Sequence, residues 1–535
     1  MFSFLHRASL MERYHTGLLD RSLLLALIGI TALLTDLGLG TSDYGSRCMD
    51  EAATLCLADI ERPSIIRLQA LVIIVKHRIL SKRLSGAFML HGVASRFATA
   101  LRLNHENPAL CFLAQESLRR LMWSLFMIDS GISSGRPDLA LWPDPEHQIH
   151  IQLPCNERNF EFDLPETTES LRPPPSSLDS TPAPLPDALG FMALHVRMHW
   201  LRTKILQRTI KVACAPSVED LDALPGSCAE LVSELDAFEA RLPLSFRWSE
   251  ANLRLRTYSP RLGIFVMTHI WWRQCHLDLY RLFLPGLKEA LPSSALAQLD
   301  QRFVAYNRRQ CYEHARAMAD MFAQLLTLSN SAPVTDIDLP GCAFQCARML
   351  YHGLQTAGDE LGFTAEGVRE FALVCLRAAK QSTAGPACAG IQADIKQLIA
   401  GGLELSQNQP ASLESTRLAA DTSYLPYLAP SIGSSRPRVG PLSINALPVA
   451  YDPGFAQVYD GPATASLALG EPARELATSQ PLDAPSRTSA GTSTSNALKE
   501  IDGLNFEPHF LGANLWTAAD FSNDWPSLGR FPGAS

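Results

Sequence analysis

Three apolar segments follow one another in residues 63–137: PSIIRLQALVIIVKHRIL at 63–80, GAFMLHGVASRFATALRLNHE at 86–106, and QESLRRLMWSLFMIDSGISSGRP at 115–137. Apolar residues recur in each at intervals of three and four, the period of an amphipathic helix. The expected stripes are Ile65, Leu68, Val72, Val75 and Ile79; Leu90, Val93, Phe97 and Leu101; and Leu118, Leu121, Leu125 and Ile128. The stretch therefore predicts three packed helices.

Polar residues mark the ends of these helices. Ser64 is placed to cap the first one, and Gly135-Arg136-Pro137 predicts a turn after the third. Arg119 and Arg120 fall outside the apolar stripe of the third helix. Arg96 and Arg102 fall outside that of the second, where their stems can cover apolar surface. Arg136 is expected to bind carbonyls at a helix C-terminus.

Length and charge limit the possible classes of protein. A chain of 535 residues exceeds one ordinary core and predicts two or three folding units. Its formal net charge is −8, so it lacks the positive charge with which a DNA-binding domain holds phosphates. The apolar run 23–34 is shorter than the roughly 20 residues of a membrane span, and predicts a core helix. We therefore expect no membrane association.

The rest of the chain divides by composition. Helical patterns continue near 189–212, 217–241, 260–284, 296–329, 338–358, 364–381 and 387–405, and no segment has the alternation of a strand. Residues 138–165 predict an extended loop. Residues 166–188 are rich in Pro and Ser and predict a linker that does not pack. The expected fold class is all-α: one multi-helical domain in two parts, 1–165 and 189–405.

Residues 406–535 predict a disordered tail, because their Pro, Ser, Thr, Gly and Ala bury too little apolar surface to offset ordering entropy. Within it, residues 500–525 hold five acidic residues and no Lys or Arg. The interleaved aromatic residues are Phe506, Phe510, Trp516, Phe521 and Trp525. Acidic-hydrophobic sequence of this kind is typical of disordered activation segments.

Four patterns suggest chemistry, and each has a simpler explanation. Gly131 to Gly135 match G-x-S-x-G around Ser133, but a nucleophile elbow needs a strand before the serine. His195 and His199 have metal-compatible spacing without the Glu of H-E-x-x-H, and Cys342 and Cys346 lack a second ligand pair. The aromatic stretch 269–276 fits either a ligand pocket or core packing. The favoured interpretation of the Ser133 pattern is a turn that ends a helix, and that of the two histidines is an amphipathic helix. The cysteine pair and the aromatic stretch are interpreted as core packing.

The twelve cysteines are scattered singly, which is typical of a reducing compartment. No two of them have C-x-x-C spacing, so the crowded thiolates of a two-zinc DNA-binding cluster are absent from the sequence. No phosphate-binding glycine motif is present either. We expect no cofactor in this chain and no enzymatic activity.

The order of motifs in 63–137 resembles the middle homology region of fungal zinc-cluster transcription factors, the fungal-specific transcription factor domain. The matching residues are Leu68, Gln69, Ala70, Arg96, Arg119, Arg120, Trp123, Asp129, Gly135, Arg136 and Pro137. The match is strongest over about residues 1–165, and 276–281 (HLDLYR) resembles a later helix of the same proteins. The resemblance implies an all-helical domain that controls an N-terminal zinc-cluster DNA-binding module in a nuclear regulator, often with a dimerising coiled coil.

The resulting hypothesis is a regulator of RNA polymerase II transcription in a fungus. The abrupt start at Met1 favours an incomplete chain whose zinc cluster is missing; the alternative is a chain that reaches DNA through a partner. Expected partners are coactivators or a zinc-cluster protein, in a homo- or heterodimer. The competing functions are a heterodimerisation scaffold that does not activate, and a serine hydrolase using Ser133.

Overall fold

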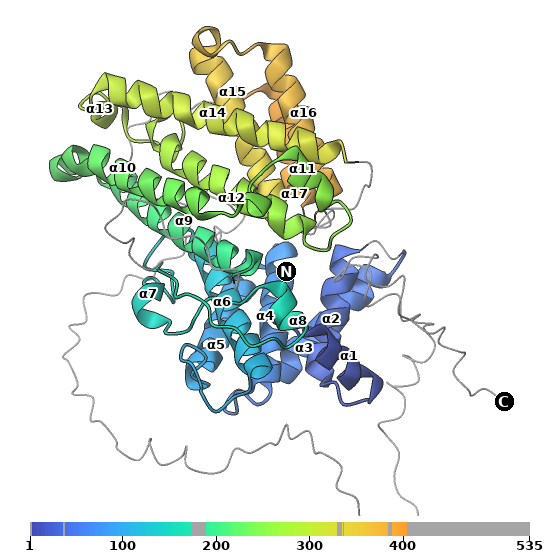
Figure 1. Ribbon diagram of the computed structural model, residues 1–535. Helices are drawn as coiled ribbons and strands as arrows, with labels where there is room; N and C mark the ends of the chain where they lie inside the picture. The colour runs from blue at the N-terminus through green and yellow to red at the C-terminus, as the bar shows by residue number, and fades with distance from the viewer. Residues whose placement is uncertain are drawn as a thin grey trace, which may run out of the picture. The chain divides into compact units, whose positions relative to one another are not determined.

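The computed structural model describes residues 3–35, 38–172, 189–328, 334, 336–382 and 388–403. Within these residues the fold is all-α, as predicted: they form helices and two isolated β-bridges, with no strand (Figure 1). No described helix is long and apolar enough to cross a membrane. The predicted tail, including its five aromatic residues, lies outside the described residues.

The first part of the chain contains eight α-helices among its described residues. They are α1 (Arg7–His15), α2 (Arg21–Leu34), α3 (Thr41–Leu57), α4 (Ile65–Leu80), α5 (Leu84–Ala100), α6 (Phe112–Ser133), α7 (Pro145–Gln148) and α8 (Glu157–Glu161). The last two are short helices inside a segment predicted to be an extended loop. Asn156 caps α8 by accepting a hydrogen bond from the Asn159 N–H at 2.9 Å, so the helix forms despite its nearby prolines.

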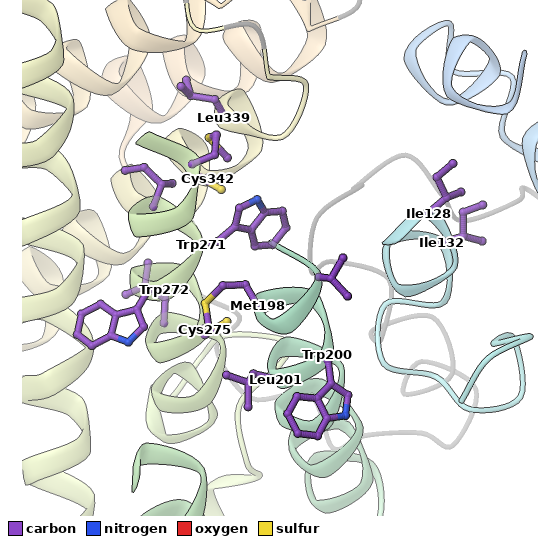
Figure 2. Packing of buried hydrophobic residues seen from close by; sticks show 14 of the residues in the cluster. Ile128, Ile132, Met198, Trp200, Leu201, Trp271, Trp272, Cys275, Leu339 and Cys342 are labelled. Carbon is purple, nitrogen blue, oxygen red and sulfur yellow. The ribbon is translucent and has the colours of Figure 1, made fainter. Parts of the chain in front are cut away.

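The second part contains longer helices close to the predicted ranges. They are α9 (Phe191–Cys214), α10 (Val218–Arg241), α11 (Glu250–Leu255), α12 (Leu262–Tyr280), α13 (Ser293–Leu296), α14 (Gln301–Leu326), α15 (Leu339–Leu361), α16 (Ala365–Gln381) and α17 (Ala389–Gly401), with 3-10 turns η1 (Leu244–Phe246) and η2 (Arg281–Phe283). Ser217 and Thr364 cap α10 and α16 by accepting backbone N–H groups. Figure 2 shows Met198 and Leu201 of α9 in the same apolar cluster as Trp271 and Cys275 of α12.

The helices of 63–137 form at the predicted places. Ser64 caps α4 by accepting the Arg67 N–H at 3.3 Å. On α5 the predicted stripe is only partly confirmed: Phe97 is buried, but the centre of the buried face is displaced. Ala87, Ala94 and Ala98 are fully buried, whereas Leu90 and Val93 are only half-buried. The small alanines let α5 lie close to its neighbours, and this close approach decides which face turns inward.

The first residues of the predicted linker are packed, which corrects the prediction for that part of it. Residues 166–172 are described, and Leu171 is 3% exposed. The Glu169 carboxylate accepts hydrogen bonds from Nη2 of Arg197 at 2.5 Å and Nη2 of Arg241 at 2.6 Å. This segment therefore packs against α9 and α10, because two buried arginines bind the one acidic residue in its middle. Residues 173–188 lie outside the described residues.

Candidate functional site

A polar cluster is centred on α6. Glu116, Arg119, Arg120 and Trp123 lie on this helix and are buried, and the partly exposed Glu106 precedes it; we call these five residues the α6 cluster. Nε of Arg120 donates to Oε1 of Glu116 at 2.8 Å, and its Nη2 donates to the Cys155 carbonyl at 2.7 Å. The same Glu116 oxygen accepts the Cys155 N–H at 2.9 Å. The pair therefore holds the backbone at Cys155 against α6 from both its N–H and its carbonyl side.

Arg119 extends this arrangement toward the end of α5. Its Nε and Nη2 donate to the two carboxylate oxygens of Glu106 at 2.8 and 3.0 Å, a bidentate geometry. Glu106 also accepts the Gln152 N–H at 2.8 Å, and the Trp123 indole donates to the Gln152 carbonyl at 2.9 Å. The α6 cluster thus binds both ends of the segment 152–155.

The position of these arginines corrects the prediction from helical spacing. Arg119 and Arg120 lie outside the predicted stripe, yet they are only 9% and 1% exposed. An arginine can be buried when carboxylates and carbonyls accept hydrogen bonds from its N–H groups. Hydrophobicity alone therefore does not define the inner face of α6. Burial, and after it the nearby Glu116 carboxylate, raises the pKa of the Cys155 thiol to about 12.

Asp129 fixes the chain that follows the third motif helix. Its Oδ2 accepts the N–H groups of Leu141 and Trp142 at 3.0 and 2.9 Å. Its Oδ1 lies 3.1 Å from Nε2 of His91 on α5, and both side chains are 2% exposed. One buried carboxylate therefore joins α5, α6 and the loop after the turn.

The predicted turn brings the chain against α9. Ser134 and Gly135 have φ angles of +47° and +83°, the left-handed region that favours glycine. A Cβ atom at Gly135 would lie 2.3 Å from Cβ of Leu206, so no larger residue fits. Arg136 forms an ion pair with Asp138, and Pro137 is exposed.

Some motif residues lie apart from the α6 cluster. Leu68 and Ala70 of α4 are fully buried in the hydrophobic core, and Gln69 between them is half-buried. Arg96 is exposed on the outer face of α5. The structure therefore brings together Arg119, Arg120 and Trp123, whereas Arg96 faces solvent.

Sequence reasoning missed two further buried charge clusters in the second part. Asp278 on α12 accepts from Nε of Arg202 on α9 at 2.7 Å, from Gln274 at 2.9 Å, and lies 3.1 Å from Nη2 of Arg281. Glu289 accepts both terminal nitrogens of Arg348 at 2.8 Å. The available signal was a charged residue within an otherwise apolar helical face, as in HLDLYR.

The other sequence candidates are in packed surroundings. Ser133 is the last residue of α6 and is 1% exposed, so the strand–turn–helix context of a nucleophile elbow is not present there. His195 binds the Ile264 carbonyl through Nε2 at 3.2 Å, and the His199 ring lies 4.8 Å from that of Trp271. Burial lowers the pKa of both histidines.

The cysteine pair and the aromatic stretch are also part of the core. Cys342 and Cys346 are fully buried on α15. The rings of His276 and His314 stack with centroids 4.0 Å apart, beside Trp272. Among the residues that the structure describes, no three His, Cys, Asp or Glu side chains form a group that could hold a metal ion.

Comparison with known proteins gives one family match. Residues 1–189 match the family described as "Fungal specific transcription factor domain". This range contains all of the motif helices and the α6 cluster. No solved structure matches.

The relatives are transcription factors or transcriptional regulators of fungi, not enzymes. "Zn(2)-C6 fungal-type transcription factor FTF1c" of Fusarium oxysporum f. sp. lycopersici is 26% identical over 54% of this chain and 33% of its own length. "Uncharacterized transcriptional regulatory protein C530.11c" of Schizosaccharomyces pombe is 24% identical over 52% of this chain and 36% of its own. A second S. pombe protein, C1327.01c, is 31% identical over 24% of this chain and 14% of its own.

The chain thus spans about a third of the length of the first of these relatives. The name of the Fusarium protein refers to a two-zinc, six-cysteine cluster. The residues present here do not fit such a group, because no two cysteines in the printed sequence have C-x-x-C spacing.

Proposed function

We propose that this chain is the regulatory portion of a nuclear regulator of RNA polymerase II transcription in a fungus, because residues 1–189 match the family described as "Fungal specific transcription factor domain". The observation that carries the proposal is the set of spaced motifs in 63–137. Its charged members Glu116, Arg120 and Asp129 are used to join separate segments of one helical unit. Contacts of this kind are structural, and they support a rigid regulatory scaffold.

DNA contact belongs to another module in this proposal. A net charge of −8 gives the chain no general attraction to phosphates. DNA would be reached through a zinc-cluster module outside the printed sequence, or through a zinc-cluster partner in a dimer. A direct test is a mobility-shift assay of the purified chain with random duplex DNA at 150 mM salt, in which no shift is expected below micromolar protein.

The activating function is assigned to residues 500–525. They hold five acidic residues interleaved with five aromatic ones, a composition typical of segments whose aromatic side chains enter the groove of a coactivator. Aromatic side chains that enter such a groove contribute most of the binding free energy, whereas the acids mainly speed association.

A reporter experiment tests this assignment. Residues 490–535 are fused to a heterologous DNA-binding domain in yeast, beside a variant with Phe506, Phe510, Trp516, Phe521 and Trp525 changed to Ala. A matched control changes five polar residues, Asn505, Asn514, Thr517, Ser522 and Asn523, to Ala. We expect activation from the parent and the control, and loss in the aromatic variant.

Absence of activation by the parent, or equal activation by all three fusions, overturns the activation assignment. An inert tail together with co-purification of a zinc-cluster protein would instead support a heterodimerisation scaffold. Retention of the full chain on that protein through the helical domain is measured by size-exclusion chromatography of the mixture.

A further inference from the structure

Three polar side chains from separate helices approach one another inside the fold. They are Lys76 of α4, His199 of α9, and Asp338, the residue that precedes α15. Protein surrounds Lys76 and Asp338 on all sides, yet each residue keeps part of its surface accessible. That accessible part therefore faces space inside the fold. We call these three residues the interior site.

The groups of the interior site do not bind one another. Among the residues that the structure describes, Lys76 forms no hydrogen bond or ion pair, and the Asp338 carboxylate accepts no hydrogen bond. Nδ1 of His199 has no partner either, although this residue is only 7% exposed. Burial lowers the pKa of Lys76, and burial, with Asp336 after it, raises the pKa of Asp338 to about 7.

Unpaired charges inside a protein are costly, so folds pair them or use them. The other buried cations follow the first course: Arg120 donates to Glu116, and Arg202 donates to Asp278. The interior site does not, although Lys76 and Asp338 lie close enough for each to affect the pKa of the other. Unsatisfied polar groups around interior space are typical of a site whose partners come from a bound molecule.

One wall beside the interior site is aromatic and positively charged. The His199 ring lies 4.8 Å from that of Trp271 on α12, and the Arg202 guanidinium carbon lies 5.2 Å from the Trp271 ring centroid. Leu339, which follows Asp338, belongs to the same apolar cluster as Trp271 (Figure 2). The surroundings thus combine one cation, one carboxylate and one uncharged imidazole with an apolar wall.

We propose that the interior site binds a small zwitterionic molecule of the free amino acid class. The Lys76 ammonium donates to the carboxylate of this molecule, the Asp338 carboxylate accepts from its amino group, and Nδ1 of His199 forms a further hydrogen bond. Because protein encloses both charged residues, a peptide or a nucleic acid does not fit. The inference goes beyond the proposed function and does not rest on it, since binding is measured without transcription.

Thermal unfolding of the purified full chain, with each of the twenty common L-amino acids added at about 10 mM, tests the binding. At least one of them should raise the midpoint by about 3 °C, the shift for a molecule at 100 times its Kd in a folded unit of this size. Isothermal titration calorimetry with that amino acid should then give a Kd of about 0.1 mM. No shift with any of the twenty overturns the proposal.

Two substitutions locate the binding. Lys76→Met and Asp338→Asn each remove one charge with little change in shape, and each should weaken binding of that amino acid at least about tenfold. The matched controls are Lys288→Met and Asp222→Asn, because both residues are exposed, and they should keep the Kd of the parent. An unchanged Kd in Lys76→Met or in Asp338→Asn overturns the proposal.

Stability without added amino acid separates binding from a structural role. The double variant, Lys76→Met with Asp338→Asn, should unfold at or above the midpoint of the parent, because neither charge has a partner in the empty fold. A lower midpoint shows that the two charges stabilise the fold, and it overturns the proposal.

Two analogues of the bound amino acid test the class of molecule. One lacks the amino group and the other lacks the carboxylate, so each leaves one charge of the interior site unpaired. Both should bind at least about tenfold more weakly than the amino acid. Equal binding of either analogue overturns the assignment to a zwitterion.

Discussion

Nε of Arg120 donates a 2.8 Å hydrogen bond to Oε1 of Glu116, one turn earlier on α6, and neither side chain is more than 1% exposed. The pair is surrounded by apolar core, yet it also binds the N–H and the carbonyl of Cys155, 35 residues further along the chain. A buried ion pair contributes little net stability by itself. Its effect here is to fix where the segment 152–155 crosses α6.

Replacing Arg120 with Ala should lower the free energy of unfolding by about 3–5 kcal/mol, because the buried Glu116 carboxylate then loses its nearest cation and keeps only Arg119 at 3.5 Å. Urea denaturation followed by circular dichroism measures the change. Arg158→Ala is the matched control, since Arg158 is exposed on α8, and its effect should stay within about 0.5 kcal/mol. Similar values for the two variants would contradict the structural role of Arg120.

Asp129→Ala should lower the free energy of unfolding by about 2–4 kcal/mol, because the partly buried N–H of Leu141 and the buried N–H of Trp142 both lose their acceptor. Amide hydrogen exchange should become faster at these two residues than at other loop amides. Asp129→Asn keeps one oxygen acceptor and should restore part of the loss. Unchanged exchange at Leu141 and Trp142 in Asp129→Ala would show that Asp129 does not hold this loop.

Gly135→Ala should be strongly destabilising, by about 2 kcal/mol or more, because φ is +83° and the new Cβ would meet Leu206 at 2.3 Å. Gly92→Ala is the matched control within a helix. A Cβ there meets nothing within 4 Å, so the change should be neutral or raise stability by up to about 1 kcal/mol. Midpoints of thermal unfolding compare the two, and a lower midpoint for Gly92→Ala than for Gly135→Ala would refute the geometry.

Acid should destabilise the fold before most carboxylates titrate. Burial lowers the pKa of His77 and His269 to about 4, and that of His276 to about 3. The folded state therefore binds fewer protons than the unfolded state, so stability falls as pH drops below the unfolded pKa of about 6.5 and continues to fall to about pH 4.

In that window each such histidine lowers the free energy of unfolding by up to about 1.4 kcal/mol for each unit that the pH falls. His276 is the best one to remove, because neither ring nitrogen has a hydrogen-bond partner among the described residues. His276→Phe should reduce the slope of unfolding free energy against pH between 6 and 4.5. An unaltered slope in His276→Phe would be the contrary result.

The sequence predicted local structure well where one residue decides it. Ser64 caps α4 and Gly135 makes the turn, since capping and a positive φ depend on the residue itself. Periodicity located α9, α10, α12 and α14 to α17 within a few residues. It was less successful with faces: the α5 stripe was displaced, and Arg119 and Arg120 were placed outside the buried face of α6.

The sequence by itself determined the all-α class of the described chain and the order of its motifs, because helical period and caps are local properties. Only the tertiary structure decided that Glu116, Arg120 and Cys155 meet, that Asp129 binds the Leu141 and Trp142 backbone, and that Glu169 fixes the start of the predicted linker. Charged partners far apart in the chain leave no periodic signal, and their burial depends on contacts that exist only after the helices have packed. The stretch 63–137 therefore carried the family resemblance, and the fold showed which backbone groups Arg120 and its neighbours bind.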